Sequence, residues 1–317
     1  MAPEVAEIGT VVVIGGANVD VSVSSKTPLV PHDSTPGEIH CSPGGVARNV
    51  AENLSRLGVN VSLISVVGND LFGQRLQEAT AQAGVNVDAL HVLPGQRTAS
   101  YMALHGPMGE LTVAVNDMEI LETLSPQLLQ NHVDLLKQAK CIVLDCNLGA
   151  DSLAWLLQRD TLPPFFVDGV SAAKCTRLVP VLERIHTLKV NRLEAQALTG
   201  RVVKSVIDAL EASQQLQAMG ARHVVLSLGQ DGACWCDGSG RVGYKAARPV
   251  KVVNTNGAGD AMMAGLVHAH LAGKLLEEAV DWASTCAEIT IGSALANAPM
   301  LSTAAVQASR SFAPKTT

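Results

Sequence analysis

Charged residues are scarce in this sequence, because Asp, Glu, Lys and Arg make up 16% of its 317 residues. An average soluble protein has about 25%. Disordered chains and coiled coils need far more charge and polarity than this, so both classes are excluded. Aromatic residues are also few, at 3%, whereas glycine is abundant, at 27 residues. No apolar run approaches the roughly 18 residues that a membrane-spanning helix requires, so the composition predicts a globular protein with a large core.

Basic residues are in deficit, and the net charge is −6. Nucleic acids and anionic membranes are bound by basic stripes, so we expect neither as a partner. The amino-terminal segment MAPEVAEIGT contains two acidic residues and no basic region, so we expect no signal peptide there. The seven cysteines are an odd number in a long chain, which indicates reduced thiols and a cytoplasmic location.

Two short segments pair residue types that can bind metals. They are Cys234-Trp235-Cys236 and His268-Ala269-His270. Neither has a matching partner pair elsewhere in the chain, as a zinc site would need. We therefore interpret both pairs as structural.

Apolar, β-rich segments alternate with helical segments along most of the chain. The predicted strands are 10–16, 61–68, 140–146, 164–170, 186–191 and 222–229, and the predicted helices are 45–57, 71–83, 127–139, 152–159 and 206–219. Several strands are apolar at successive positions, which suits strands that are covered on both faces. The alternation predicts an α/β fold with a mostly parallel central sheet between two helical layers.

Four further short strands have no helix after them. They are 18–23, 38–42, 98–105 and 111–115, and the last two are joined by the turn 106–109. We expect them to form one small antiparallel sheet that covers a cleft beside the α/β body. No linker divides the chain, and only a polar tail near 313–317 departs from the pattern. The prediction is one domain, 1–317, with a discontinuous lid from about 18–42 and 97–117.

The strongest functional signal is the segment Asn254-Thr255-Asn256-Gly257-Ala258-Gly259-Asp260, ahead of a predicted helix at 261–272. Small residues before a helix leave backbone N–H groups uncovered, and the helix dipole adds positive potential there. Gly257, Ala258 and Gly259 are therefore predicted to form an anion hole. Asp260 would accept a proton from a hydroxyl that attacks a phosphoryl group. An Asp that only caps the helix is the alternative.

Two glycine-rich segments precede possible sugar contacts. The first, Gly15-Gly16-Ala17-Asn18-Val19-Asp20, lacks the third glycine of a dinucleotide fingerprint, which argues against an NAD-dependent oxidoreductase. If the chain continues as a strand, Asn18 and Asp20 share one face and suit adjacent sugar hydroxyls. In the second segment, Gly44 and Gly45 permit close approach by a ligand, and Asn49 lies one helical turn further on. A solvent-facing Asn after a glycine N-terminus is the alternative.

Two strand ends carry possible phosphate contacts. Asn191 and Glu194 follow the predicted strand 186–191 and suit a phosphate and a Mg²⁺-bound water. A capping box is the alternative. Ser227, Gly229 and Gly232 lie in a turn whose donors suit nucleotide phosphates, with a simple strand-to-strand turn as the alternative.

In this order along one chain, the motifs resemble the ribokinase-like carbohydrate and nucleoside kinases of the PfkB family, over about 11–298. The paired glycines with Asn49 resemble one family signature, and NTNGAGDAMMAG at 254–265 resembles the other. The resemblance implies a three-layer ribokinase-like α/β body with a small β-sheet lid, and ATP and Mg²⁺ as phosphoryl donor and metal. It also implies site roles: Asp260 as catalytic base, Gly257, Ala258 and Gly259 as anion hole, Asp20, Gly45 and Asn49 at the sugar, Asn191, Ser227, Gly229 and Gly232 at ATP, and Glu194 at the metal. Asn18 and Gly44, which adjoin these sugar contacts, are predicted to bind the sugar with them.

Within the family, the stretches GGVARNVAENLSRLG, VDGVSAAKC and HTLKVNRLEA are similar to bacterial pseudouridine kinases. This similarity implies ATP-dependent phosphorylation of the ribose 5′-hydroxyl of pseudouridine. The alternatives are another nucleoside or sugar kinase, with ribose, adenosine or inosine as acceptor, and a nucleotide- or sugar-binding regulator without turnover. Most members have Asp at the position of Asn254, where it is associated with a monovalent-cation site. The Asn argues against activation by K⁺.

We expect residues of the lid to select the nucleobase of the substrate. Thr98 and Ser100 would share one strand face, and Asn116 and Asp117 end the next strand. Pseudouridine offers one N–H donor more than uridine, so an acceptor opposite that donor would discriminate against uridine. Asp117 is the candidate, and an exposed hairpin-end Asp is the alternative. Apolar residues on both faces of the lid need cover, so we also expect a homodimer through the lid.

Overall fold

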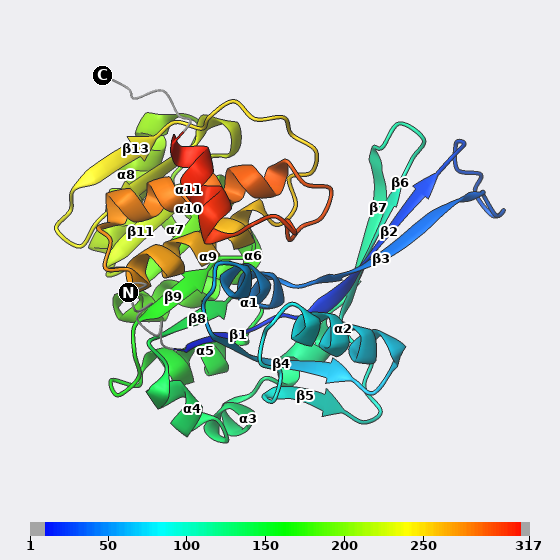
Figure 1. Ribbon diagram of the computed structural model, residues 1–317, viewed down its shortest axis with the longest axis horizontal. Helices are drawn as coiled ribbons and strands as arrows, with labels where there is room; N and C mark the ends of the chain where they lie inside the picture. Colours follow the sequence, from blue (N-terminus) through cyan, green and yellow to red (C-terminus); the bar gives the residue numbers. More distant parts are fainter. Residues whose placement is uncertain (1–9, 312–317) are drawn as a thin grey trace, which may run out of the picture.

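A nine-stranded sheet forms the centre of the computed structural model, which describes residues 10–311 (Figure 1). Its order is β13-β12-β11-β10-β9-β8-β1-β4-β5. The strands are β1 (Val11–Ile14), β4 (Val61–Gly68), β5 (Leu90–Leu93), β8 (Cys141–Asp145), β9 (Phe165–Asp168), β10 (Thr187–Asn191), β11 (His223–Ser227), β12 (Ala233–Cys236) and β13 (Val242–Lys245). All neighbours from β5 to β11 are parallel, and only β12 and β13 are antiparallel at one edge. The prediction of a mostly parallel central sheet is confirmed.

Helices cover both faces of this sheet. One face packs against α5 (Ala150–Leu157), α7 (Arg192–Thr199), α8 (Val206–Ala218) and the shorter α6 (Ala172–Cys175), η1 (Glu119–Thr123) and η2 (Thr176–Arg184). The other face packs against α1 (Val46–Arg56), α9 (Ala258–Leu271), α10 (Leu276–Ile291) and α11 (Thr303–Ser311). In β1, Val12 and Ile14 face the first core and Val11 and Val13 the second. Burial on both sides explains the continuous apolar runs in the sequence.

The predicted helix 127–139 is wrong, because the structure has two short helices there. They are α3 (Pro126–Gln130) and α4 (Val133–Gln138). Asn131 ends the first helix and His132 begins the second, and both residue types have low helix propensity. Helices α10 and α11 and strands β5 and β13 lie in segments where the sequence analysis predicted no element.

A second, small sheet projects from the body (Figure 1). Its order is β3 (Gly37–Gly44), β2 (Asn18–Ser25), β6 (Ser100–His105) and β7 (Leu111–Asp117). The prediction that it is wholly antiparallel is wrong, because β2 and β6 are parallel. The two strands follow β1 and β5, which run parallel in the central sheet, so they leave the body in the same direction.

The two faces of the small sheet differ in polarity. Asp20 pairs with Tyr101, and Tyr101 pairs with Asn116, so these three side chains share one face. Val21 and Met102 lie on the opposite face, which is mainly apolar. Near the body this second face packs on α2 (Leu71–Gln82), and further out its apolar side chains are exposed.

The two pairs of potential metal ligands pack into the core. Cys234 and Cys236 are buried in β12, His268 stacks on Trp282, and His270 packs against the ring of Phe166. Within residues 10–311, no group of three or more His, Cys, Asp or Glu side chains is arranged to hold a metal ion. All seven cysteines are free thiols, and six of them are buried.

Two expectations concern the ends of the chain. The first nine residues, where we expect no signal peptide, and the polar tail at 313–317 lie outside the described residues. Over the part that is described, no helix combines the length and the apolar character needed to cross a membrane.

Candidate active site

The first turn of α9 carries the segment that the sequence singles out most strongly. Gly257 is the N-cap residue of this helix, with φ at +78°. A Cβ added to Gly257 would lie 1.9 Å from the carbonyl oxygen of Ala296, so neither the backbone conformation nor the space admits a side chain. No side chain caps this helix end. Its first N–H groups therefore remain available to an anion.

Asp260 lies in the first turn of the same helix, and its carboxylate does not cap the helix. Its Oδ2 accepts a hydrogen bond of 2.8 Å from Nδ2 of Asn49 in α1. Burial raises the pKa of Asp260 to about 7, and the nearby carboxylate of Asp168 adds to the rise. The hydrogen bond from Asn49 and the charge of Lys189 oppose this rise in part. A carboxylate that titrates near neutral pH suits a general base.

Lys189 is a buried cation beneath the same helix end. Its Nζ donates to Asp168 Oδ2 at 2.9 Å, and both side chains are buried. A Cβ added to Gly259 would lie 2.6 Å from this Nζ, which places the ammonium against the predicted anion hole. Burial disfavours the charged form of Lys189, but Asp168 and Glu194 outweigh it and raise its pKa. We did not predict this residue, although a lysine inside the apolar strand TLKVN is a visible signal.

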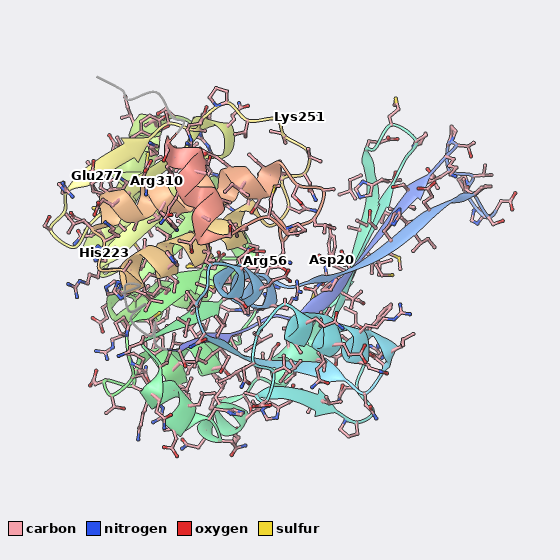
Figure 2. All side chains as sticks on the ribbon, viewed as in Figure 1. Asp20, Arg56, His223, Lys251, Glu277 and Arg310 are labelled. Atoms are coloured by element: carbon pink, nitrogen blue, oxygen red, sulfur yellow. The ribbon has the colours of Figure 1, made fainter. Side chains whose placement is uncertain are left out.

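Asp20, one of the predicted sugar contacts, lies where the small sheet meets the body (Figure 2). Asn18 and Asp20 are on β2, and Nδ2 of Asn18 donates to Oδ1 of Asp20 at 2.7 Å. Gly44 lies opposite Asn18 in the neighbouring strand. Asn49 joins this group to the start of α9 through its hydrogen bond to Asp260. The solvent-facing alternative for Asn49 is wrong, because its side chain is buried and paired.

Asp145, at the end of β8, fixes the backbone of this region. Its Oδ2 accepts hydrogen bonds of 2.9 Å from the N–H groups of Gly16 and Ala47, and its Oδ1 accepts one of 2.8 Å from Asn147. Burial raises the pKa of Asp145, and these donors oppose the rise. The carboxylate joins the turn before β2 to the start of α1. We did not predict this role, although an acidic residue directly follows the apolar run CIVL.

Asn191 and Glu194 form a capping box at the start of α7, so this alternative from the sequence is confirmed. Oδ1 of Asn191 accepts from the Glu194 N–H at 3.0 Å, and Oε2 of Glu194 accepts from the Asn191 N–H at 2.9 Å. Glu194 is 1% exposed, and burial together with Asp168 raises its pKa. A role of these residues at phosphate or metal stays a prediction.

The predicted ATP-binding turn follows β11. Ser227 ends this strand, η3 (Gly229–Asp231) forms a short turn, and Gly232 leads into the antiparallel β12. The simple strand-to-strand turn, which is the alternative from the sequence, is therefore present. Contact with nucleotide phosphates stays a prediction for Ser227, Gly229 and Gly232.

Two of the residues that we expected at the nucleobase lie away from the face of the small sheet that carries Asp20. Thr98 precedes β6, where its hydroxyl donates to Asp70 and accepts from the Gly68 N–H, at 2.6 and 2.9 Å. Asp117 pairs with Ser100 in the register of the small sheet, so it lies on the face opposite to Asp20. Its carboxylate accepts from Arg97 at 2.8 Å. Of the residues that we expected at the nucleobase, Asn116 shares the face of Asp20. Contact of Thr98 or Asp117 with the nucleobase stays a prediction.

Three comparisons with known proteins agree with this geometry. The family described as pfkB family carbohydrate kinase matches residues 9–304. Pseudouridine kinase from Escherichia coli (strain K12) is 42% identical over 296 residues, which are 93% of this chain and 95% of that protein. The crystal structure of a putative sugar kinase from Clostridium perfringens is 32% identical, with a TM-score of 0.84 over 95% of each chain.

The fold is also that of a ribokinase. The structure of Arabidopsis thaliana ribokinase complexed with ribose and ATP has a TM-score of 0.86 and 20% identity, over 96% of this chain and 99% of that one. At this identity the likeness concerns the fold. The ribokinase-like architecture that the sequence implies is confirmed.

Proposed function

Because the chain belongs to the pfkB family of carbohydrate kinases, we propose that it transfers the γ-phosphoryl group of ATP to the ribose 5′-hydroxyl of pseudouridine. The family assigns a phosphotransferase that acts on a small sugar or nucleoside. The 42% identity to a pseudouridine kinase supports the particular acceptor. The observation that carries the chemistry is the Asp260 carboxylate, with a pKa near 7, beside the uncapped N-terminus of α9.

The proposed reaction uses this arrangement directly. Asp260 removes the proton of the 5′-hydroxyl, the oxygen forms a bond to the γ-phosphorus, and the bond from that phosphorus to the bridging oxygen of ADP breaks. The transition state is loose, so the stabilisation of charge on the phosphoryl oxygens dominates. The N–H groups at the start of α9 and the ammonium of Lys189 supply that stabilisation. Asn18, Asp20 and Asn49 hold the ribose in line for attack.

The acidic groups around Lys189 fit Mg²⁺ bound together with ATP. Glu194 and Asp168 offer carboxylate oxygens, which this ion prefers. Because no cluster within residues 10–311 is arranged to hold a metal by itself, ATP phosphates and water would supply most of the ligands, as is usual for Mg²⁺. Glu194 and Asn191 would lie next to it, and Mg²⁺ would neutralise charge on the β- and γ-phosphates.

We propose that Asn116, rather than Asp117, contacts the nucleobase of pseudouridine. Asn116 shares the polar face of the small sheet with Asp20, so its amide oxygen is available to the additional N–H donor of pseudouridine. Asn116→Ala is expected to lower kcat/KM for pseudouridine by about tenfold, the loss typical of one hydrogen bond, and to leave the value for uridine nearly unchanged. Initial rates with the two nucleosides measure this ratio.

Asp117→Ala is the matched control for this variant. It changes the neighbouring residue on the opposite face and removes only the exposed pair with Arg97. The ratio between the two nucleosides should stay as in the wild-type protein. If Asp117→Ala no longer discriminates between pseudouridine and uridine, and Asn116→Ala still does, then Asp117 is the residue that contacts the nucleobase.

The loop before α9 supports activity without a monovalent cation. Nδ2 of Asn254 donates to the carbonyl oxygen of Ala294 at 3.0 Å, and its Oδ1 accepts from the Asn256 N–H at the same distance. A neutral amide thereby joins two loops by hydrogen bonds. Rates in potassium, sodium and tetramethylammonium chloride at matched ionic strength are therefore expected to be equal. Asn254→Asp loses the donor to Ala294 and should be slower in all three salts. Wild-type activity that rises selectively with potassium would contradict this proposal.

We also propose that the small sheet is a lid and that its apolar face packs against a second copy of the chain. Ile39, Met102 and Val115 are 67%, 49% and 63% exposed on this face. Apolar side chains in a row on an open sheet are typical of a protein interface. The lid would exclude water, which competes with the nucleoside as phosphoryl acceptor.

A panel of acceptors tests the proposed function. ADP formation with pseudouridine, uridine, adenosine and ribose should give the highest kcat/KM for pseudouridine. A higher value for ribose or adenosine would assign a sugar kinase or another nucleoside kinase. Binding of ATP without transfer to any acceptor would instead indicate the regulator.

A further inference from the structure

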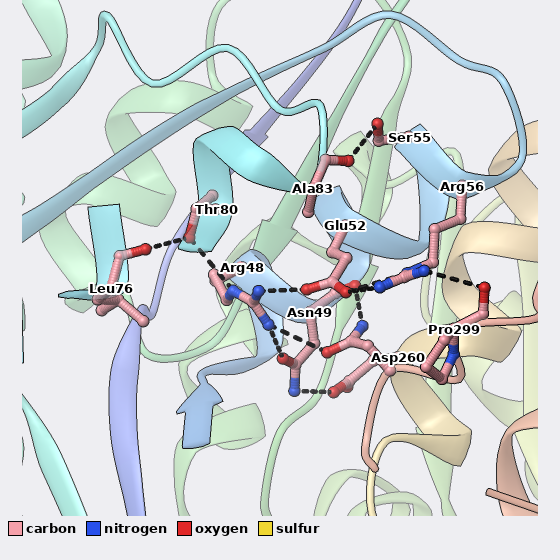
Figure 3. Close-up of polar contacts among 11 residues, drawn as sticks. Arg48, Asn49, Glu52, Ser55, Arg56, Leu76, Thr80, Ala83, Asp260 and Pro299 are labelled. Atoms are coloured by element: carbon pink, nitrogen blue, oxygen red, sulfur yellow. Dashed lines mark hydrogen bonds and ion pairs between the residues drawn. The ribbon is translucent and has the colours of Figure 1, made fainter. Parts of the chain in front are cut away.

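Arg48 is a buried arginine next to the proposed base, and it is 3% exposed. Its guanidinium donates to Oδ1 of Asn49 at 3.2 Å, to Oδ1 of Asn297 at 3.1 Å and to Oγ1 of Thr80 at 3.3 Å (Figure 3). It also forms an ion pair with Glu52. The proposed reaction does not assign this side chain a role, although Arg48 directly precedes Asn49, the residue that contacts Asp260.

The contact with Asn49 fixes the orientation of an amide. An Asn side chain can turn over and exchange its oxygen for its nitrogen, but a guanidinium only donates hydrogen bonds. The oxygen of Asn49 must therefore face Arg48. As a consequence, Nδ2 of Asn49 faces Asp260, where it donates at 2.8 Å. A donor at this position stabilises the ionised carboxylate, which is the form that accepts a proton.

The charge of Arg48 is balanced within the same network. Glu52 is 5% exposed and also accepts from Nε of Arg56, at 3.0 Å. Arg56 in turn donates to the carbonyl oxygen of Pro299 at 3.1 Å and reaches the surface. Arg56 does not contact Asn49 or Asp260. A substitution of Arg56 therefore perturbs the network alone, whereas a substitution of Arg48 also affects Asn49 and, through it, Asp260.

The same guanidinium reaches the loop that follows α10. Asn297 accepts from Arg48 and donates from its Nδ2 to the backbone oxygen of Asn49 at 2.9 Å. Its neighbour Ala296 provides the carbonyl oxygen that lies against Gly257. Arg48 therefore contacts both the amide that faces the base and the loop that borders the N-terminus of α9.

We propose that Arg48 is a positioning residue of the phosphoryl transfer, which holds the Asn49 amide with its N–H₂ group toward Asp260 and so keeps this carboxylate ready to accept the proton. The inference deepens the proposed function and rests on it for the reaction. The orientation itself depends only on the hydrogen bonds of the free protein.

Arg48 affects the balance between the protonated and the ionised form of Asp260. Asp260 is surrounded by Asp145, Asp168 and Lys189 from the central sheet, and by Asn49 from α1. The two aspartates favour its protonated form, whereas Lys189 and the donor of Asn49 favour its ionised form. Without Arg48, the Asn49 amide is free to turn its oxygen toward Asp260, which stabilises the protonated carboxyl. The pKa of Asp260 then rises.

Arg48→Met tests this prediction, because Met has similar length and no donor. The acidic limb of the pH profile of kcat/KM should move to higher pH by about one unit, as expected for one lost charge-assisted hydrogen bond. Activity should then be lower by about tenfold at pH 6 and recover at pH 9. Arg56→Gln is the matched control. It weakens the same network but leaves Asn49 in place, so its acidic limb should stay with the wild type.

A double-mutant cycle decides whether Arg48 acts through Asn49. In an Asn49→Ala background, Arg48→Met should cause no further shift of the acidic limb. An equal shift with and without Asn49, or an equal shift in Arg56→Gln, would overturn the proposal. If Arg48→Met does not fold, Arg48→Met/Glu52→Met replaces the buried ion pair with apolar side chains, an exchange that proteins often tolerate. The same shift is expected for this pair, and its absence counts equally against the proposal.

A readout without turnover separates this inference from the proposed function. The carboxyl carbon of Asp260 can be titrated by ¹³C NMR in protein labelled at aspartate, with Asp260→Asn to assign the resonance. Its midpoint should lie near pH 7 in the wild type and about one unit higher in Arg48→Met. If pseudouridine is not phosphorylated but this midpoint moves, the proposed acceptor is wrong and the positioning role stands. If the nucleoside is phosphorylated and the midpoint stays, only the positioning role fails.

Discussion

Asp260→Asn is expected to lower kcat by about 10³-fold and, at the same time, to stabilise the folded protein at pH 8. The loss of rate follows from the loss of the base, since general-base catalysis contributes about 10²–10⁴-fold. Binding of pseudouridine should persist, because Asn keeps an acceptor for the hydrogen bond from Asn49. Stopped-flow or steady-state rates, together with calorimetric binding of the nucleoside, measure the two effects.

The gain in stability follows from the sign of the pKa shift. The pKa of Asp260 is raised from 3.8 to about 7, so between these values the folded state binds more protons than the unfolded state. The free energy of unfolding therefore decreases as pH rises through this window, and the full cost is present above pH 7. Asp260 is partly exposed, so we expect the Asn variant to gain roughly 2 kcal/mol at pH 8. At pH 4 the difference should vanish. Urea unfolding at both pH values measures it.

Asp208→Asn is the matched control in the first turn of α8. Backbone donors, with that of Ser205 foremost, lower the pKa of Asp208. This group therefore stabilises the fold above its unfolded pKa, and the stability is lost as pH falls through its folded pKa. The Asn variant should lose stability at pH 8 and keep full activity. Equal changes in stability for the two variants would show that burial of Asp260 has no special cost.

Gly257→Ala is expected to reduce kcat/KM by about 10²–10³-fold, because the new Cβ would meet the Ala296 carbonyl at 1.9 Å. The loop must move, and the N–H groups that follow then lose their alignment with the phosphoryl oxygens. One such donor contributes about 3 kcal/mol to the transition state. The KM for pseudouridine should change little, since the nucleoside contacts lie on β2 and α1. Steady-state kinetics with each substrate varied in turn separates the two constants.

Gly273→Ala is the control for the glycine conformation itself. Gly273 lies just after the other end of the same helix, with φ at +69°, and no atom lies within 4 Å of an added Cβ. The variant should lose about 1 kcal/mol of stability through backbone strain and retain its activity. An equal loss of activity in both variants would remove the argument for an anion hole.

The layers of the fold could be predicted from the sequence because burial is a local property. Continuous apolar runs such as VVVI predict strands that are covered on both faces, and the small residues of NTNGAGD predict a helix end with uncovered N–H groups. The position of Asp260 followed from the same local pattern. Its pKa did not, because it depends on Asp168 and Lys189, which arrive from other strands.

The remaining features depend on register and on contacts between distant segments. Whether Asn116 or Asp117 faces the nucleoside changes with a shift of one residue, since successive side chains point to opposite faces. The hydrogen bond of Arg48 to Asn297 joins residues 249 positions apart, and its sequence neighbours give no sign of it. Asn191 and Glu194 differ from these residues, because their spacing in the sequence predicts the capping box that the structure shows. Their predicted role at the metal depends on the bound nucleotide.

The proposed phosphoryl transfer is tested most directly by its product, formed by the wild-type protein with ATP and pseudouridine as the only acceptor and followed by ³¹P NMR. One new phosphomonoester is expected, coupled to the two protons of the ribose 5′-carbon, that forms together with ADP and is absent with Asp260→Asn. A phosphoryl group on another hydroxyl, faster conversion of uridine or ribose, or an undiminished product yield with Asp260→Asn at equal times would contradict the proposed transfer.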